Sequence, residues 1–231
     1  MNFKFKHFEI QQAINAHKVG TDSMLLGALA KGNFTRILDI GTGTGILALM
    51  AAQNHPKASV TAIEPDLPSY EEAINNFQNS PFSDRILGIN STLQYFGSME
   101  KFDLIISNPP YFQNAYLSED PDRNRARHTS DLPIYELYEF AADLLAEGGE
   151  MHVIIPFELE TTHVERAFDN DLFVKKVVHS ISPNGTTKRS ILVFSEEEVD
   201  PEVSQFQIRQ NDGNYTSEYK ELTKEFHGVE L

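Results

Sequence analysis

Short apolar runs alternate with stretches of helical period along the middle of the sequence, and this alternation restricts the possible folds more than any other feature. Strands that alternate with helices form a largely parallel sheet with helices on both faces. An α/β architecture is therefore predicted, with each helix as a right-handed crossover between strands. The expected strands are residues 36–40, 59–64, 85–89, 102–107, 150–155, 174–181 and 190–194, and the expected helices are residues 22–30, 46–54, 67–78, 134–146 and 159–168.

Turn-forming residues indicate where these elements end. Gly148-Gly149 is expected to stop a helix just before a strand, and Ser182-Pro183-Asn184-Gly185 is typical of a hairpin turn that makes the last of seven strands antiparallel. Polar residues 114–133 have neither strand nor helix period and are expected to form a loop. The predicted division is an N-terminal segment at 1–33, a main domain at 34–195 and an extension packed on it at 196–231, which begins with an acidic solvated connector.

The composition is that of a globular protein: of 231 residues, 40% are hydrophobic and 23% charged. The sequence has no apolar run of about 18 residues and no signal-peptide core, so a cytoplasmic protein without membrane contact is expected, as a monomer. It has no cysteine, and its eight histidines lack metal-site spacing such as H-E-x-x-H, so no metal is expected. The net charge of −15 argues against a surface for non-specific nucleic-acid binding.

A glycine-rich loop, Gly41-Thr42-Gly43-Thr44-Gly45, joins the strand at 36–40 to an apolar helix, with Asp39 just before it. Glycine permits positive φ and lets the backbone approach a ligand, and the helix start offers free N–H groups. Such a loop alone also suits NAD, FAD or a tight structural turn. Glu64 ends the next strand, where a carboxylate can accept hydrogen bonds from ribose hydroxyls. The glycine spacing departs from G-x-G-x-x-G and resembles the first motif of Rossmann-like methyltransferases, so S-adenosylmethionine is the expected cofactor.

A second motif, Asn108-Pro109-Pro110-Tyr111, follows the apolar strand at 102–107. The lone pair of an adenine amine or an amide nitrogen is delocalised, so such a nitrogen attacks a methyl sulfonium poorly. The Asn108 side-chain oxygen and the Pro109 carbonyl can accept hydrogen bonds from the two N–H groups of this nitrogen. Proline fixes φ, and Tyr111 can stack on a flat substrate. Asn-Pro-Pro also occurs in ordinary turns, but this position after a strand predicts in-line methyl transfer with placed acceptors.

These motifs resemble the bacterial methyltransferases that modify N6 of the adenine beside the anticodon of a valine tRNA. The resemblance covers residues 17–28, 38–45, 102–111 and 125–129 and ends at 215–226, and Val19-Gly20-Thr21-Asp22 is its most specific part. It implies a Rossmann-like class I methyltransferase fold in which residues 18–22 close over the cofactor and residues 108–111 hold adenine. The cofactor-binding residues implied are Lys18, Gly20, Thr21, Asp39, Gly41, Gly43, Gly45, Glu64, Thr92 and Asn108.

The chain departs from the family pattern at two places. Where an aspartate usually follows the third strand, it has Asn90-Ser91-Thr92, which offers only neutral acceptors for the adenine of the cofactor. Glu64 is followed by Pro65-Asp66, so its contact with the cofactor is expected to shift.

Basic residues near these motifs are the candidates for contact with RNA phosphates. They are Arg123, Arg125 and Arg127 in the polar loop, with Lys188 and Arg189 as further candidates. The arginines of the loop suit a merely solvated loop as well. Thr21-Asp22 suits a helix N-cap as well as a cofactor gate.

Three other functions stay open. Glutamine methylation of a translation release factor needs the same acceptors as adenine methylation, and guanine-N2 methylation of ribosomal RNA is a further enzyme activity. A non-catalytic S-adenosylmethionine-binding or RNA-binding module would not require the motif at 108–111. The sequence favours methyl transfer from S-adenosylmethionine to a tRNA adenine.

Overall fold

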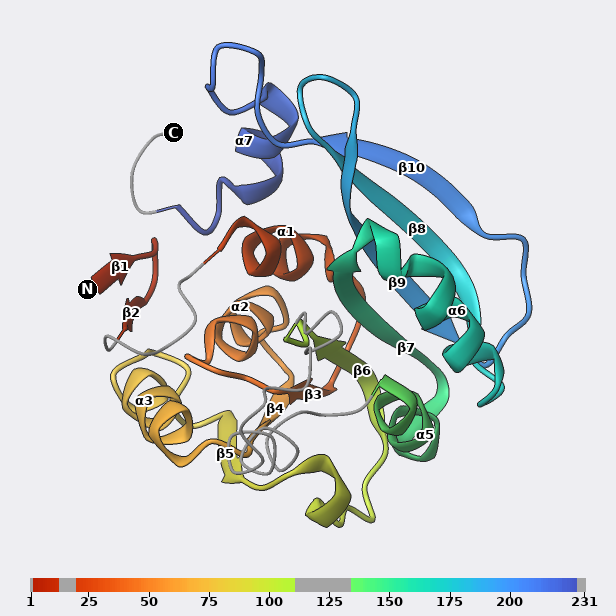
Figure 1. The fold of residues 1–231 in the computed structure, drawn as a ribbon. Helices are drawn as coiled ribbons and strands as arrows, with labels where there is room; N and C mark the ends of the chain where they lie inside the picture. Colours follow the sequence, from red (N-terminus) through yellow and green to blue (C-terminus); the bar gives the residue numbers. More distant parts are fainter. Residues whose placement is uncertain (1, 13–19, 111–133, 228–231) are drawn as a thin grey trace, which may run out of the picture.

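The sheet contains eight strands in the order β10-β8-β9-β7-β6-β3-β4-β5 in the computed structural model, which describes residues 2–12, 20–110 and 134–227 (Figure 1). Neighbouring strands pair in parallel, except that β9 is antiparallel to both β7 and β8. The strands are β3 (Arg36–Ile40), β4 (Ser59–Glu64), β5 (Ile86–Asn90), β6 (Phe102–Ser107), β7 (Leu145–Pro156), β8 (Phe173–Ile181), β9 (Thr187–Ser195) and β10 (Glu202–Gln207).

Helices cover both faces of the sheet and form two hydrophobic cores (Figure 1). Side chains alternate between the faces along each strand, so Ile37 packs in one core and Leu38 in the other. One core contains side chains of α1 (Thr21–Leu29), α2 (Ile46–Asn54) and α3 (Leu67–Gln78), and the other those of α5 (Ile134–Leu144) and α6 (Glu160–Phe168). No described helix is long and apolar enough to cross a bilayer.

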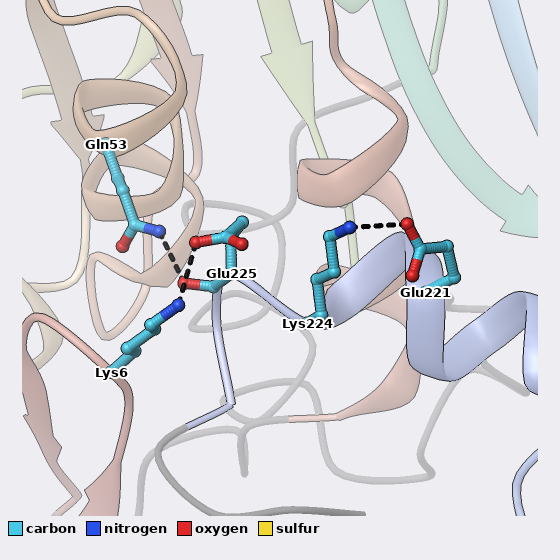
Figure 2. Close-up of polar contacts among 5 residues, drawn as sticks. All are labelled: Lys6, Gln53, Glu221, Lys224 and Glu225. Atoms are coloured by element: carbon cyan, nitrogen blue, oxygen red, sulfur yellow. Dashed lines mark hydrogen bonds and ion pairs between the residues drawn. The ribbon is translucent and has the colours of Figure 1, made fainter.

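The two ends of the described chain lie together. A short hairpin, β1 (Asn2–Lys4) with β2 (Glu9–Gln11), precedes the sheet, and α7 (Ser217–Thr223) follows it. Lys6 forms a 2.8 Å ion pair with Glu225, whose backbone oxygen also accepts a 2.7 Å hydrogen bond from the Gln53 side chain on α2 (Figure 2). Phe5 and Phe226 are buried in the same core. Because exposed ion pairs stabilise little, this apolar burial contributes more than the Lys6 ion pair to holding the end of the described chain against the core.

The predicted closing hairpin is confirmed. Gly185 has a φ of +81° and donates a 2.8 Å hydrogen bond to the Ser182 carbonyl, which closes the turn between β8 and β9. The conformation favours glycine because a side chain is strained at positive φ.

Two expectations about the strands are wrong. The sheet has an eighth strand, β10, which pairs in parallel with β8 at the edge of the sheet. Its apolar residues, Val203 and Phe206, lack strand alternation, so no pattern indicated it. The helix predicted to reach residue 146 ends at Leu144, and Gly148-Gly149 lie inside β7, which begins at Leu145 and has a register shift opposite Phe102 and Leu104. Gly148 has a φ of +72°, and both glycines lie between Leu145 and Glu150, the two residues of β7 that pair with β6 on either side of this shift, so they form the irregularity in the strand.

Candidate functional site

Parallel pairing brings the two sequence motifs to one edge of the sheet. Ile40 at the end of β3 lies opposite Ile63 of β4 on one side and Ser107 of β6 on the other. The glycine loop, Glu64 and Asn108 each follow one of these positions, so they share the carboxyl edge. Ligands bind at this edge in open α/β sheets.

The glycine loop has a backbone conformation that other residues adopt only with strain. Gly43 has a φ of +55°, and a Cβ built there would meet nothing within 4 Å, so conformation explains this glycine rather than crowding. Gly45 has a φ of +84°, and its Cβ would lie 2.4 Å from the Phe77 ring. The loop is thus held close to α3 at Gly45 while its surface at Gly43 stays open.

Asp39 attaches the loop to the start of α2. It is fully buried, and its Oδ2 accepts hydrogen bonds from the Thr42 hydroxyl at 2.5 Å and the Ala48 amide at 3.0 Å. Its Oδ1 is buried without a hydrogen-bond partner among the described residues. Burial raises the pKa of the Asp39 carboxyl to about 7 against the effect of these bonds, and the Glu64 charge raises it further.

Glu64 organises the other side of the loop. Its Oε2 accepts a 2.8 Å hydrogen bond from the Gly43 amide, and its Oε1 accepts one of 3.0 Å from the Asp66 amide. Each carboxylate oxygen can accept more than one hydrogen bond, so these contacts are compatible with ribose hydroxyls. The charge of the Glu64 carboxylate beside the loop suits a ligand that carries positive charge.

Two polar side chains, Asn90 and Thr92, lie at the end of β5 and just after it. The Asn90 side chain donates hydrogen bonds to the Glu64 carbonyl at 2.8 Å and the Pro65 carbonyl at 3.2 Å, so it supports the end of β4. The Thr92 hydroxyl is instead buried without a partner among the described residues. A buried hydroxyl of this kind fits a ligand contact, since buried polar groups are normally satisfied.

Asn108 is held between β6 and α1. Ser107 donates a 2.9 Å hydrogen bond to the Ile40 carbonyl, which ties the end of β6 to β3. The Asn108 Nδ2 then donates a 2.9 Å hydrogen bond to the Ser23 hydroxyl on α1. Among the described residues of the motif, Pro109 is half-buried and Pro110 is exposed. Sequence reasoning missed Ser23, and its only signal was its place directly after Thr21-Asp22.

The N-cap interpretation of Thr21-Asp22 is wrong. Helix α1 begins at Thr21, the N-cap residue is Gly20, and no side chain caps the helix. Asp22 instead forms a 2.8 Å ion pair with Arg189 of β9. This ion pair brings Arg189, one of the residues predicted to contact RNA phosphates, to the first turn of α1.

Several predicted site residues lie outside the described residues. They are Lys18, Tyr111, Arg123, Arg125 and Arg127. Within the described ranges, no group of three or more His, Asp or Glu side chains could hold a metal ion.

Known sequences resemble this chain over nearly its whole length. The profile of the methyltransferase small domain matches residues 16–178. A "tRNA1(Val) (adenine(37)-N6)-methyltransferase" from Flavobacterium johnsoniae is 41% identical over 97% of this chain and 98% of its own length. A protein of the same name from Bacteroides thetaiotaomicron is 38% identical over 97% of this chain and 96% of its own length.

Solved structures share the fold. A predicted O-methyltransferase from Agrobacterium tumefaciens superposes with a TM-score of 0.68 at 18% identity, over 88% of this chain and 96% of that one. At this level of identity the similarity concerns the fold alone. It agrees with the predicted mostly parallel sheet, helices on both faces and antiparallel hairpin.

Proposed function

This chain belongs to the tRNA1(Val) (adenine(37)-N6)-methyltransferase family, within the methyltransferase small domain family, and from this membership we propose that it methylates N6 of adenine 37 in a valine tRNA. The methyl donor is S-adenosylmethionine. The observation that carries the proposal is the meeting of the glycine loop and Asn108 on one sheet edge, where β3 pairs with β6. A donor site and an acceptor site must be adjacent for direct transfer.

The residues at the loop fit S-adenosylmethionine. This cofactor supplies a methyl group on a positively charged sulfur and also carries an amino group and ribose hydroxyls. The unpartnered Asp39 Oδ1 and the neighbouring Glu64 carboxylate offer acceptors and negative charge, and the Thr92 hydroxyl offers a further polar contact. We propose these three residues, the open backbone at Gly41 and Gly43, and Gly20, Thr21 and Lys18 as the binding set.

Asn108 and Pro109 act on the substrate nitrogen. The Asn108 oxygen and the Pro109 carbonyl accept hydrogen bonds from the two N–H groups of the amine. This arrangement directs the nitrogen lone pair toward the methyl group. Positive charge develops on nitrogen during transfer, so these acceptors stabilise the transition state more than the bound amine. The Ser23 contact holds the Asn108 side chain in place. Tyr111 stacks on the adenine, and Arg123, Arg125 and Arg127 meet tRNA phosphates.

Calorimetry with two ligands tests the cofactor assignment. The protein is expected to bind S-adenosylmethionine and to give no measurable heat with NAD, because the spacing of Gly41, Gly43 and Gly45 departs from the G-x-G-x-x-G loop that receives a pyrophosphate. Product S-adenosylhomocysteine serves as the control, since it retains the amino group and the ribose. Tight binding of NAD with no response to S-adenosylmethionine would reject the assignment.

A further inference from the structure

A hollow of about 360 Å³ opens on the carboxyl edge of the sheet, apart from the glycine loop. Its walls come from the first turn of α1, the end of β8, the β8–β9 turn, the start of β9 and the segment after β10, which lies beside that turn in Figure 1. The polar residues that line it include Thr21, Asp22, Lys188, Arg189 and Arg209. The last of these belongs to the C-terminal segment that the sequence patterns did not connect with any site.

The charge of the hollow is positive in a chain whose net charge is −15. Three cationic side chains, Lys188, Arg189 and Arg209, line it with one carboxylate, Asp22. Asp22 is paired with Arg189 at 2.8 Å. Lys188 is exposed, and no described acidic residue forms an ion pair with it. The pairing of Arg189 therefore leaves two positive charges that Asp22 does not balance.

Arg209 is held in place by neutral groups. Its guanidinium donates hydrogen bonds to the Gly213 carbonyl at 2.7 Å and the Tyr215 hydroxyl at 3.0 Å, and it lies 4.1 Å from the centre of the Tyr215 ring. These contacts fix the side chain without cancelling its charge. An orientated guanidinium of this kind is suited to phosphate, which it can bind through its remaining N–H groups.

The hollow also adjoins the residues that hold the substrate motif. Asp22 in its wall directly precedes Ser23, and the Ser23 hydroxyl accepts the hydrogen bond from Asn108. A polyanion bound in the hollow therefore lies on the same first turn of α1 that supports the motif. An RNA strand that enters the motif with one base carries phosphates on both sides of that nucleotide, and these need cationic contacts at the same sheet edge.

We propose that this hollow binds a backbone phosphate of the substrate RNA through Lys188 and Arg209, with Arg189 kept in position by Asp22. This rests on the proposed function, since it assigns one phosphate contact of the same substrate. The C-terminal segment thereby becomes part of the RNA-binding surface. A phosphate contact adds affinity and fixes the register of the strand without reading its bases.

The test is tRNA binding over a range of salt concentrations with Lys188→Ala and, separately, Arg209→Gln. Each variant is expected to bind unmodified tRNA roughly tenfold more weakly, since a hydrogen bond to a charged group is lost. The slope of log affinity against log salt should become shallower by about one unit in each. Lys57→Ala is the matched control, because Lys57 is an exposed lysine just before β4, at the opposite edge of the sheet, and its slope should equal that of the parent.

Affinity for S-adenosylmethionine and the thermal midpoint, measured on the same samples, show whether each variant is folded. The proposal would be overturned if a folded variant bound tRNA with the affinity and the salt slope of the parent. It would also be overturned if a variant bound an acidic protein substrate more weakly while its binding of tRNA was unchanged. Failure of the proposed function is seen separately, because the parent itself would then transfer no methyl group to tRNA.

Discussion

Asn108→Ala is expected to reduce methyl transfer at least roughly a hundredfold, because removal of one preorganised polar contact to a transition state typically costs about 3–4 kcal/mol. Asn108 lies at the end of β6, and its amide is held by Ser23 at 2.9 Å, so the side chain is positioned before the substrate arrives. Affinity for S-adenosylmethionine should change little, since the glycine loop, Asp39 and Glu64 do not depend on this side chain. Single-turnover transfer of labelled methyl and calorimetry measure the two quantities.

Ser23→Ala provides the matched comparison. It leaves the Asn108 oxygen in the protein and removes only the partner of its amide, so turnover should fall less than in Asn108→Ala. Tyr111→Ala should first weaken substrate binding, because stacking is worth about 1–3 kcal/mol per base. Near-parental turnover in Asn108→Ala would contradict the assigned chemistry.

Glu64→Ala is expected to weaken S-adenosylmethionine binding by roughly tenfold or more, the usual effect of losing a buried hydrogen bond to a charged group. Glu64 is 8% exposed and binds the Gly43 amide at 2.8 Å, so its loss removes an acceptor for the ribose and a support of the loop. Glu71→Ala on α3 is the control, because Glu71 is an exposed carboxylate that belongs to neither β4 nor the glycine loop. Calorimetry on folded samples of all three proteins gives the affinities.

Equal cofactor affinity in Glu64→Ala and the parent would move the cofactor away from the end of β4. If Glu71→Ala loses as much affinity as Glu64→Ala, a general effect of charge would account for both results.

The central elements of the fold were predictable because their local signals and their tertiary environment agree. β3, β4, β6, α2 and α3 have the predicted bounds, since continuous apolar runs and clear helix starts coincide with buried positions. β10 could not be predicted, because it gains its order from pairing with β8 rather than from its own pattern. The place of Gly148-Gly149 in a register shift of β7 could not be predicted either, because it depends on how β7 pairs with β6 on both sides of the glycines.

The candidate site was predictable where one motif supplies its own context. The loop at Asp39–Gly45 directly follows one strand, and Asn108 directly follows another. Parallel pairing of these two strands then makes the motifs neighbours. Contacts between distant segments gave no such signal. Neither the Ser23 bond to Asn108, 85 positions apart, nor the Asp22 pair with Arg189, 167 positions apart, can be read from either segment.

The most direct test of the central claim is transfer of labelled methyl from S-adenosylmethionine, with unmodified valine tRNA and a translation release factor offered together. The amide of a release-factor glutamine and the adenine amine suit the same acceptors at Asn108 and Pro109, so competition between them decides the substrate. Nuclease digestion and mass mapping then locate the label. The proposed function predicts label in the tRNA, on N6 of adenine 37. Label in the release factor, or on N2 of a guanine in RNA, would contradict it.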